Sequence, residues 1–310
     1  MINILLAVGG IALVIFGADR LVAGSVGIAE RMRISQIVIG LTVVAMGTSA
    51  PELFVSIMSA LAGTPDLAVG NIVGSNIFNT LVIVGVTALV SPMAISRKTV
   101  RRDLPICVLA GCALAAVCAD WQISRIEAAI LFAAFIAYMV YTVREGRKNA
   151  PEADAAAQGK PMKIWAAILF VLLGFGCLIG GGQVFVIGAT GIAQSLGVSD
   201  AIIGLTVVAG GTSLPELATC VAAARKGNSE IAIGNVIGSN VFNIFMIIGA
   251  TGLIMPMTIC GVTLLDMGVM AIGGFVLWTF SYTKLTVERW EGAVLTAAYI
   301  GYTWWLISNL

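Results

Sequence analysis

The sequence predicts an all-α integral membrane protein of ten transmembrane helices, arranged as two inverted five-helix repeats. The residues are 59% hydrophobic and only 11% charged, and the mean hydropathy is +1.02. A soluble domain would carry about 25% charged residues. Apolar runs of near-spanning length recur along the whole chain, and two sequence motifs occur twice at the same spacing. Soluble fold classes are therefore excluded.

The apolar runs divide the chain into ten spans, because about 20 apolar residues cross the hydrocarbon core of a bilayer. In order they lie near residues 3–28, 35–61, 67–90, 104–119, 125–143, 163–191, 200–224, 231–255, 262–281 and 290–308. The first run lacks a basic segment and a clear cleavage site, so we expect a retained helix and not a signal peptide. We divide the chain into a first repeat (1–143), a cytoplasmic linker (144–162) and a second repeat (163–310).

The Lys and Arg residues indicate the orientation, since cytoplasmic loops carry an excess of them. An N-terminus outside the cell places fifteen of the seventeen basic residues in cytoplasmic loops and leaves Arg20 and Arg125 elsewhere. We expect a multi-pass protein of the cytoplasmic membrane with both termini on the non-cytoplasmic side. The net charge of +1 does not indicate a nucleic-acid partner. Membrane lipid is the expected surrounding, and the sequence suggests no obligatory protein partner.

The repeat is carried by two motifs. Residues 40–52 read GLTVVAMGTSAPE and residues 204–216 read GLTVVAGGTSLPE, so two of the thirteen positions differ. GNIVGSNIFN at 70–79 returns as GNVIGSNVFN at 234–243, and both motifs share an offset of 164 residues. Five spans separate the copies, and an odd number reverses the direction of crossing. Inverted repeats of this kind are typical of secondary transporters, whose binding site lies at the midplane between the halves.

Each copy of the first motif places a carboxylate, Glu52 or Glu216, just after a Gly-Thr-Ser-x-Pro sequence. Proline has no N–H and disfavours helical geometry in the preceding residue, so we expect the second and seventh helices to be broken there. The break should free carbonyl oxygens around residues 45–47. Such groups are tolerated at membrane depth only where protein or water satisfies them. A bound cation would also satisfy them.

Oxygen-bearing side chains surround these breaks. Thr48 and Thr212 each lie four residues before a glutamate and share its helix face. The third and eighth spans carry polar stripes at a spacing of four: Asn71, Ser75 and Asn79, and Asn235, Ser239 and Asn243. Such donors suit Ca²⁺ or Na⁺ and do not suit softer metals. For Asn71, Asn76, Asn235 and Asn240 taken singly, hydrogen bonding between helices is as good an interpretation as ion contact.

Two ionised carboxylates in hydrocarbon cost several kcal/mol each unless something neutralises them. No Lys, Arg or His lies in the second, third, seventh or eighth span. A cation or protons must therefore balance the charge. The charge of one Ca²⁺ or of two Na⁺ equals that of two carboxylates. Replacement of one ion by the other would therefore produce exchange, provided that the protein cannot change its access from one side of the membrane to the other while the site is empty.

The remaining reactive residues favour structural interpretations. The six cysteines include no C-x-x-C pair and histidine is absent, so neither a zinc site nor a histidine-based protease is predicted. Asp19 and Arg20 are expected to pair locally, and acidic residues at helix ends to be solvated or paired. An ion channel is disfavoured because a filter usually needs a ring of subunits. We predict no enzyme activity and no cofactor.

At the paired Gly-Thr-Ser-x-Pro-Glu and Gly-Ser-Asn-x-Phe-Asn motifs, the sequence resembles the calcium/cation antiporter superfamily, in particular bacterial and archaeal sodium/calcium exchangers. The resemblance covers both halves and implies an inverted-repeat antiporter that carries Ca²⁺ and Na⁺ by alternating access. It implies a central Ca²⁺ between Glu52 and Glu216, with Na⁺ sites around it. The other implied ligands are Thr48, Ser49, Ser75, Asn79 and the Ala45 carbonyl, and Thr212, Ser213, Ser239, Asn243 and the Ala209 carbonyl.

Two departures from the family pattern concern the counter-ion. Some relatives, including the potassium-dependent exchangers, have Asp at the position of Asn243. The Asn in this chain therefore disfavours potassium cotransport. Proton-coupled relatives share a Gly-Asn-Ala-x-Glu type of motif that this chain lacks. We therefore expect Na⁺, with Ca²⁺/H⁺ or another cation/H⁺ antiport as the alternative. Mg²⁺ and Mn²⁺ remain open as further cargo.

Overall fold

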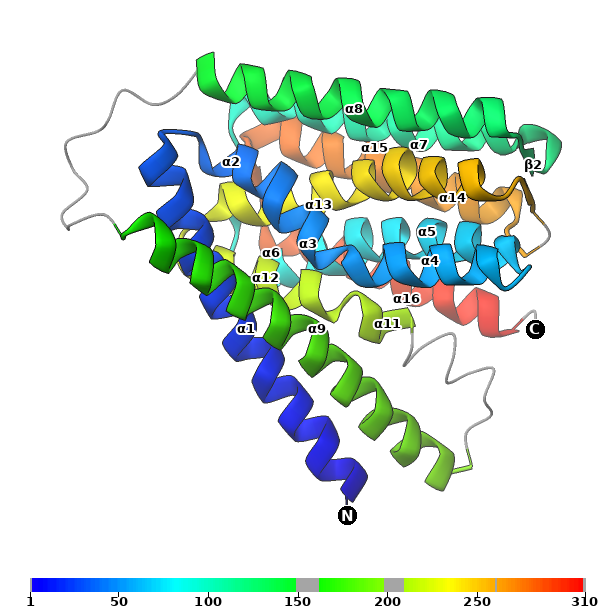
Figure 1. The fold of residues 1–310 in the computed structure, drawn as a ribbon, viewed down its shortest axis with the longest axis horizontal. Coiled ribbons are helices and arrows are strands. Elements are labelled where there is room, and N and C mark those ends of the chain that lie inside the picture. The colour runs from blue at the N-terminus through cyan, green and yellow to red at the C-terminus, as the bar shows by residue number, and fades with distance from the viewer. Residues whose placement is uncertain (1, 149–161, 198–208, 260, 309–310) are drawn as a thin grey trace.

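The structure, a computed structural model, describes residues 2–148, 162–197, 209–259 and 261–308 (Figure 1). Its first half contains α1 (Ile2–Met32), α2 (Gln36–Ile39), α3 (Ala45–Thr48), α4 (Ala50–Leu61), α5 (Pro65–Phe78), α6 (Val84–Val90), α7 (Leu104–Val117) and α8 (Arg125–Lys148). Its second half contains α9 (Ile164–Ser195), α11 (Ala209–Thr212), α12 (Leu214–Arg225), α13 (Ser229–Val241), α14 (Gly249–Ile254), α15 (Leu264–Lys284) and α16 (Arg289–Ser308).

Helices long and apolar enough to cross a membrane make up most of the described chain. There are seven of them, or eight if the pair Gln36–Thr48 and Ala50–Leu61 forms one span bent by 46°. This bend is the break predicted for the second helix. The predicted tenth span corresponds to α16, a helix of 20 residues. The start of the predicted seventh span, residues 200–208, lies outside the described residues.

Several spans contain π-helical turns that the sequence analysis did not predict. They are η1 (Gly40–Val44), η2 (Asn79–Ile83), η3 (Thr99–Asp103) and η6 (Phe242–Ile248). π-Helical turns are rare and occur frequently at functional sites. Two of them contain predicted amide ligands, since Asn79 begins η2 and Asn243 lies in η6.

α1 and α9 pack against each other in antiparallel directions, and Figure 1 shows them extending together from the other helices. Glycines make this approach possible. A Cβ at Gly10 would lie 2.7 Å from the Gly181 carbonyl, and a Cβ at Gly174 would lie 2.9 Å from the Gly17 carbonyl. Small residues at close helix crossings are typical of membrane proteins, where dispersion contacts hold helices together.

Two short strand pairs connect the halves. β1 (Met93–Ala94) pairs antiparallel with β4 (Thr286–Val287), and β2 (Gln122–Ile123) pairs with β3 (Met257–Thr258). Met93 lies opposite Val287, and Met257 lies opposite Ile123. Adding 164 to Met93 gives Met257, and adding 164 to Ile123 gives Val287. The two strand pairs are therefore equivalent, and each pair joins one strand of the first half to one strand of the second.

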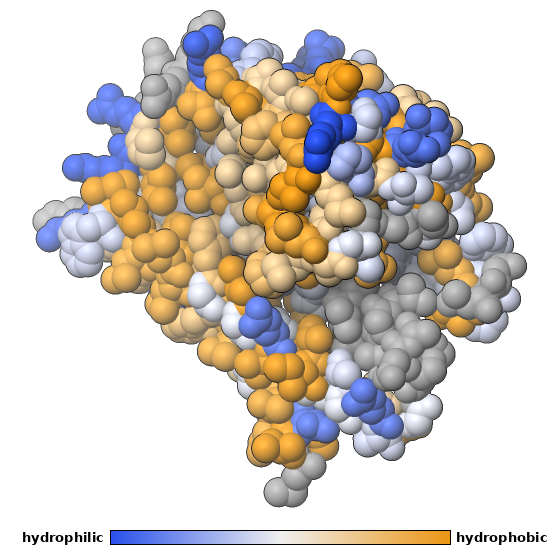
Figure 2. Space-filling model, turned by 45° about the vertical axis from the view of Figure 1, so that its right-hand side comes forward, coloured by the Kyte–Doolittle hydropathy of each residue, from blue (hydrophilic) through white to orange (hydrophobic). Residues whose placement is uncertain are grey.

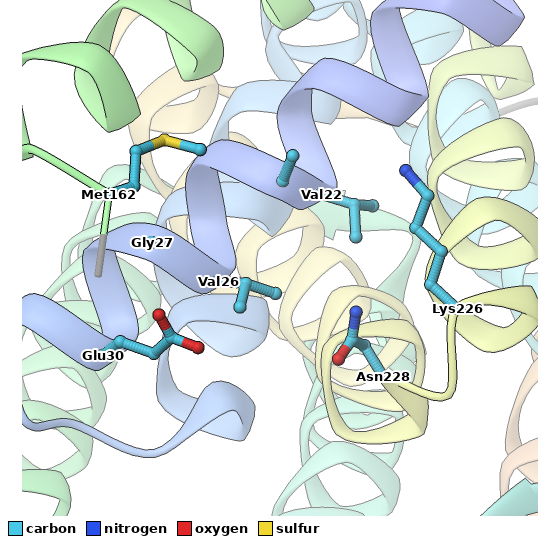
Figure 3. A pocket seen from close by; sticks show the side chains of 8 residues that line it. Val22, Val26, Gly27, Glu30, Met162, Lys226 and Asn228 are labelled. Atoms are coloured by element: carbon cyan, nitrogen blue, oxygen red, sulfur yellow. The ribbon is translucent and has the colours of Figure 1, made fainter. Parts of the chain in front are cut away.

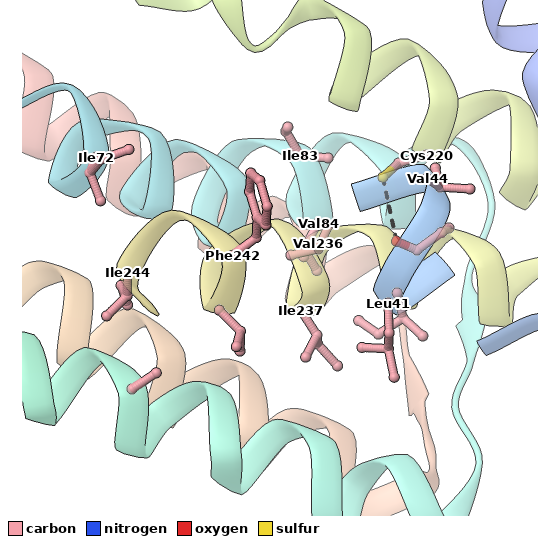
Figure 4. Packing of buried hydrophobic residues seen from close by; sticks show 14 of the residues in the cluster. Leu41, Val44, Ile72, Ile83, Val84, Cys220, Val236, Ile237, Phe242 and Ile244 are labelled. Carbon is pink, nitrogen blue, oxygen red and sulfur yellow. Dashed lines mark hydrogen bonds between the residues drawn. The ribbon is translucent and has the colours of Figure 1, made fainter. Parts of the chain in front are cut away.

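The span formed by α13, η6 and α14 lies at the centre of the molecule. In its apolar stretch of 18 residues, 89% of the residues are buried. Leu41 and Val44 of the broken second span belong to the same buried hydrophobic cluster as Val236 and Ile237 of α13 (Figure 4). A Cβ at Gly238 would lie 2.7 Å from the Cβ of Ala45, so this contact also requires glycine. The outer surface is apolar, and hydrophobic residues cover much of the face in Figure 2.

Most acidic residues at helix ends behave as predicted. Asp266 forms a capping box with Thr263, and Glu288 pairs with Lys284. The predicted pair between Asp19 and Arg20 is wrong. Asp19 instead pairs with Lys226 at 2.6 Å, and the Arg20 guanidinium lies over two phenylalanine rings. Lys226, at the end of α12, reaches Asp19 from a neighbouring helix, a contact between distant segments that the local sequence does not show.

Candidate cation site

The two helix breaks position the two predicted carboxylates. Ser49 separates α3 from α4, and Ser213 separates α11 from α12. A proline follows each break, and Glu52 or Glu216 comes next, in the first turn of the new helix. Helix N-termini favour negative charge, so each glutamate lies where its helix supports a carboxylate. Both glutamates are only 1% exposed.

Serine hydroxyls link the two breaks to each other. Ser49 Oγ donates to Glu216 Oε1 at 3.0 Å, and Ser213 Oγ donates to Glu52 Oε1 at 3.3 Å. The offset of 164 exchanges these two bonds, because it relates Ser49 to Ser213 and Glu52 to Glu216. Ser75 of α5 also donates to Glu52 Oε1, at 3.4 Å. The fold thus brings predicted site residues of both halves to one place.

Amide side chains form a second reciprocal pair of bonds between the halves. Asn79 Nδ2 donates to Asn240 Oδ1 at 3.0 Å, and Asn243 Nδ2 donates to Asn76 Oδ1 at 3.0 Å. Asn76 and Asn240 therefore orient the two predicted amide ligands through hydrogen bonds between helices. The motif spacing alone did not distinguish this role from ion contact.

Five buried oxygens of predicted ligands have no hydrogen-bond partner among the described residues. They are Oε2 of Glu52, Oε2 of Glu216, Oδ1 of Asn79, Oδ1 of Asn243 and Oγ of Ser239. Buried polar atoms of native proteins nearly always have partners, so five such atoms within the predicted ligand set require an explanation. Each is an oxygen with lone pairs available, and oxygen is the ligand atom that Ca²⁺ and Na⁺ prefer.

The charge around the glutamates is also unbalanced. Of the ion pairs within the described ranges, none involves Glu52 or Glu216. The same part of the chain contains no group of three His, Cys, Asp or Glu side chains suited to a metal. The candidate site therefore combines two carboxylates with neutral oxygens. Such a donor set fits a hard cation better than zinc or copper.

The Ala45 carbonyl is not freed by the helix break, contrary to expectation. Ala45 O accepts the Ser49 N–H at 3.0 Å and lies 3.4 Å from Thr48 Oγ1, so the break does not free this carbonyl. Pro51 has no N–H, so the helical hydrogen bond that is lost is the one to the carbonyl four residues earlier. That carbonyl belongs to Gly47 and not to Ala45. Thr48 itself is buried and donates to Asn235 Oδ1 at 3.1 Å.

The second-half counterparts of these residues lie at the edge of the described chain. Thr212 is half-buried at the end of α11, and Ala209 is the first residue of that helix. The segment that precedes them, 198–208, lies outside the described residues. Their predicted roles as ion ligands remain predictions.

A surface cavity of about 540 Å³ lies between α1 and the turn joining α12 to α13 (Figure 3). Glu30, Lys226 and Asn228 line it together with apolar residues, and no predicted ligand does. A second cavity of about 20 Å³ lies beside Asn76 and Asn240, which is room for one water molecule. The carboxylate pair is therefore enclosed by protein and is not part of either cavity.

A bundle of membrane-spanning helices that encloses two carboxylates among neutral oxygens defines a membrane transporter for cations. The chain matches the sodium/calcium exchanger protein family over residues 2–144 and 166–308 and belongs to that family. The resemblance seen at the paired motifs is thereby confirmed. Proteins of this family exchange Ca²⁺ for another cation, so the protein is an antiporter and not an enzyme.

Individual relatives support this assignment. The chain is 40% identical over 310 residues to the putative antiporter CaxA of Alkalimonas amylolytica, with 97% of each chain covered. It is 32% identical over 340 residues to the sodium/calcium exchanger MaX1 of Methanosarcina acetivorans, again with 97% of each covered. Its fold is similar to that of the sodium-calcium exchanger NCX_Mj, with a TM-score of 0.84, 31% identity and 97% of each chain covered.

Proposed function

We propose that this protein exchanges Na⁺ for Ca²⁺ across the cytoplasmic membrane, by alternating access at a site between Glu52 and Glu216. The observation that carries the proposal is the reciprocal pair of bonds from Ser49 to Glu216 and from Ser213 to Glu52. These bonds bring two buried carboxylates, without basic partners, into one cluster of oxygens. A cation that binds there meets ligands from both halves of the chain.

The proposed ligand set extends over both repeats. It comprises Glu52, Thr48, Ser49, Ser75, Asn79 and the Ala45 carbonyl, and Glu216, Thr212, Ser213, Ser239, Asn243 and the Ala209 carbonyl. Support comes from the five partnerless oxygens, all of which belong to this set. Ca²⁺ takes 6–8 oxygen ligands at flexible geometry, so twelve candidates suffice for one Ca²⁺ or for several Na⁺ in overlapping positions.

The ten-span architecture belongs to the same proposal. Residues 1–143 and 163–310 form two five-helix repeats of opposite orientation, joined by a cytoplasmic linker at 144–162, and both termini lie outside. The seventh helix is broken at the site in the same way as the second. The reciprocal strand pairs support this arrangement, as do the serine and amide bonds that the 164-residue offset exchanges. The site then lies at the midplane between the halves.

Exchange follows from the charge of the site. Two ionised carboxylates without a cation are unfavourable inside a membrane, so the empty protein resists the change of access. One Ca²⁺ or two Na⁺ neutralise the pair and make either loaded state acceptable. The two ions therefore cross in alternation and not together.

The alternative is exchange of Ca²⁺ for H⁺. It has one observation in its favour, since protons would also neutralise carboxylates that lack basic partners. Na⁺ is preferred because neutral hydroxyl and amide oxygens make up most of the proposed ligands. These groups bind a metal ion and do not take up a proton at ordinary pH.

Ion flux in proteoliposomes tests the proposal. Vesicles loaded with Na⁺ and diluted into Na⁺-free buffer are expected to accumulate radioactive ⁴⁵Ca²⁺, and vesicles with equal Na⁺ on both sides are not. Protein-free liposomes give the leak. Uptake that ignores the Na⁺ gradient but follows an imposed pH gradient would establish the H⁺ alternative instead. Competition by Mg²⁺ and Mn²⁺ in the same assay measures the selectivity for Ca²⁺.

A further inference from the structure

Thr48, a ligand in the proposed site, is the end of a buried chain of hydrogen bonds. Thr48 Oγ1 donates to Asn235 Oδ1 at 3.1 Å, and Asn235 Nδ2 donates to Cys220 Sγ at 3.3 Å. Cys220 Sγ in turn donates to the Ala232 carbonyl at 3.4 Å, a bond marked by the dashed line at Cys220 in Figure 4. The three side chains are fully buried. The chain runs from Thr48 to Ala232, and of the two acceptors near Thr48 Oγ1 the Asn235 oxygen at 3.1 Å is closer than the Ala45 oxygen at 3.4 Å.

We propose that Cys220 is a positioning residue for ion binding, which acts by holding the Asn235 amide in one orientation. The inference rests on the proposed function, because it concerns a ligand of that site. The thiol hydrogen is directed to Ala232, so the sulfur presents only lone pairs to Asn235. Only the NH₂ end of the amide can donate to those lone pairs. The carbonyl end of the amide must then face Thr48.

The orientation of this amide decides what Thr48 offers to a cation. A hydroxyl has one hydrogen and two acceptor lone pairs. When Asn235 accepts the hydrogen, the lone pairs of Thr48 stay available, and so does the lone pair of Ala45 O that the hydroxyl would otherwise occupy at 3.4 Å. A reversed amide would donate to Thr48 Oγ1 and turn the hydroxyl hydrogen to another acceptor, the Ala45 carbonyl or the neighbouring Glu216 carboxylate. Two proposed ligands would then each lose a lone pair, and cation affinity would fall.

The first half shows the same donor direction with a different acceptor atom. The offset of 164 relates Cys220 to Ser56 and Asn235 to Asn71, and Asn71 Nδ2 donates to Ser56 Oγ at 3.2 Å. A serine oxygen thus accepts the corresponding bond there. Serine is therefore the conservative replacement for Cys220, since it keeps both a donor and lone pairs in a slightly smaller side chain.

Three variants separate positioning from packing. Cys220→Ala removes the acceptor, Cys220→Val removes it while filling the volume, and Cys220→Ser retains it. The readout is the equilibrium Kd for ⁴⁵Ca²⁺ of the purified protein in detergent, together with the melting temperature without Ca²⁺. The matched control is Cys112→Ala, an exposed thiol on α7.

We expect Cys220→Ala and Cys220→Val to raise the Kd about fivefold, the factor that corresponds to one hydrogen bond of about 1 kcal/mol. Cys220→Ser and Cys112→Ala are expected to stay within about twofold of the unmodified protein. In a Thr48→Val background, Cys220→Ala should add no further loss, since the two residues act through one chain of bonds.

Three results would overturn the positioning role. One is equal binding by the unmodified protein and both apolar variants. Another is a loss with Cys220→Ser as large as with Cys220→Val, and the third is a fivefold loss that persists in the Thr48→Val background. Failure of the unmodified protein to bind Ca²⁺ would instead contradict the proposed function. The two failures are therefore distinguishable.

Discussion

Ser49 donates a hydrogen bond to Oε1 of Glu216 over 3.0 Å, although 167 residues separate them in the chain. Its mirror bond runs from Ser213 to Glu52 over 3.3 Å. Each serine lies between two helix segments, and each glutamate lies in the first turn of the second segment, so the two breaks hold each other in place. Any ion bound by these carboxylates is therefore held by both halves at once.

Replacing either glutamate by glutamine is expected to abolish exchange. The amide oxygen can still accept the serine hydrogen bond, but the charge that balances the cation is lost. Na⁺-driven ⁴⁵Ca²⁺ uptake should fall at least about a hundredfold in Glu52→Gln and in Glu216→Gln, as expected when a charged ligand worth about 3 kcal/mol is removed. Both variants should elute as the unmodified protein does in size-exclusion chromatography. Glu288→Gln, at a half-buried position outside the proposed site, is the control, and full exchange by either site variant would refute the site.

Removing the two reciprocal serine bonds tests the equivalence of the halves. A hydrogen bond to a charged group contributes about 1.5–3 kcal/mol. Ser49→Ala and Ser213→Ala should therefore each weaken Ca²⁺ binding about ten- to a hundredfold, by factors that agree within about threefold. Calcium titration of the purified proteins measures this, with exposed Ser195→Ala as the control. A large loss in one variant and none in the other would contradict a shared, two-sided site.

A methyl group at the contact of α1 and α9 is expected to destabilise the protein. A Cβ at Gly174 would lie 2.7 Å from Leu21 N and 2.9 Å from Gly17 O, and backbone atoms cannot move aside as side chains do. Overpacking of this kind costs about 1–3 kcal/mol, so Gly174→Ala should lower the melting temperature by several degrees. Gly176→Ala is the matched control, because nothing lies within 4 Å of a Cβ there. Equal melting temperatures would show that the two helices do not pack this closely.

The bond from Tyr302 to Asp266 is expected to stabilise the packing of α16 on α15. Tyr302 Oη donates to Asp266 Oδ1 at 2.6 Å, and Asp266 is only 7% exposed. Tyr302→Phe removes the hydroxyl donor and leaves Asp266 Oδ1 without this hydrogen bond. The free energy of unfolding should fall by about 1–3 kcal/mol. Thermal unfolding in detergent measures the loss against Tyr282→Phe, an exposed tyrosine. Exchange should persist in both variants at a temperature where both are folded.

The orientation of the chain is tested with reporters at its C-terminus. Alkaline phosphatase is active only when it is exported from the cytoplasm. Green fluorescent protein, fused at the same position, fluoresces only when it stays in the cytoplasm. An outside C-terminus predicts an active phosphatase fusion and a dark fluorescent fusion. The reverse pattern would contradict the orientation inferred from Lys and Arg. Fusions after Arg147, in the proposed cytoplasmic linker, serve as the control of opposite sign.

Several features of the site were inaccessible from the motifs. The expected freedom of the Ala45 carbonyl was wrong, because Ser49 N–H still bonds to it. The π-helical turns at Asn79 and Asn243 depend on how neighbouring helices pack, and local propensity does not encode them. One signal was present but unused: glycines recur every seven residues at Gly10 and Gly17, and again at Gly174 and Gly181. That spacing marks the side on which α1 and α9 meet.

The sequence by itself determined the class of protein and predicted the members of the candidate site. Hydropathy requires a membrane, and the 164-residue repeat requires two equivalent halves with a carboxylate beside a broken helix in each. Only the tertiary structure decided which atoms meet: Ser49 with Glu216, Ser213 with Glu52, and Thr48 with Asn235. The physical reason is that composition and periodicity are local properties of the chain. Hydrogen-bond partners more than 160 residues apart are chosen by the packing of whole helices, where differences of one ångström decide which donor reaches which acceptor.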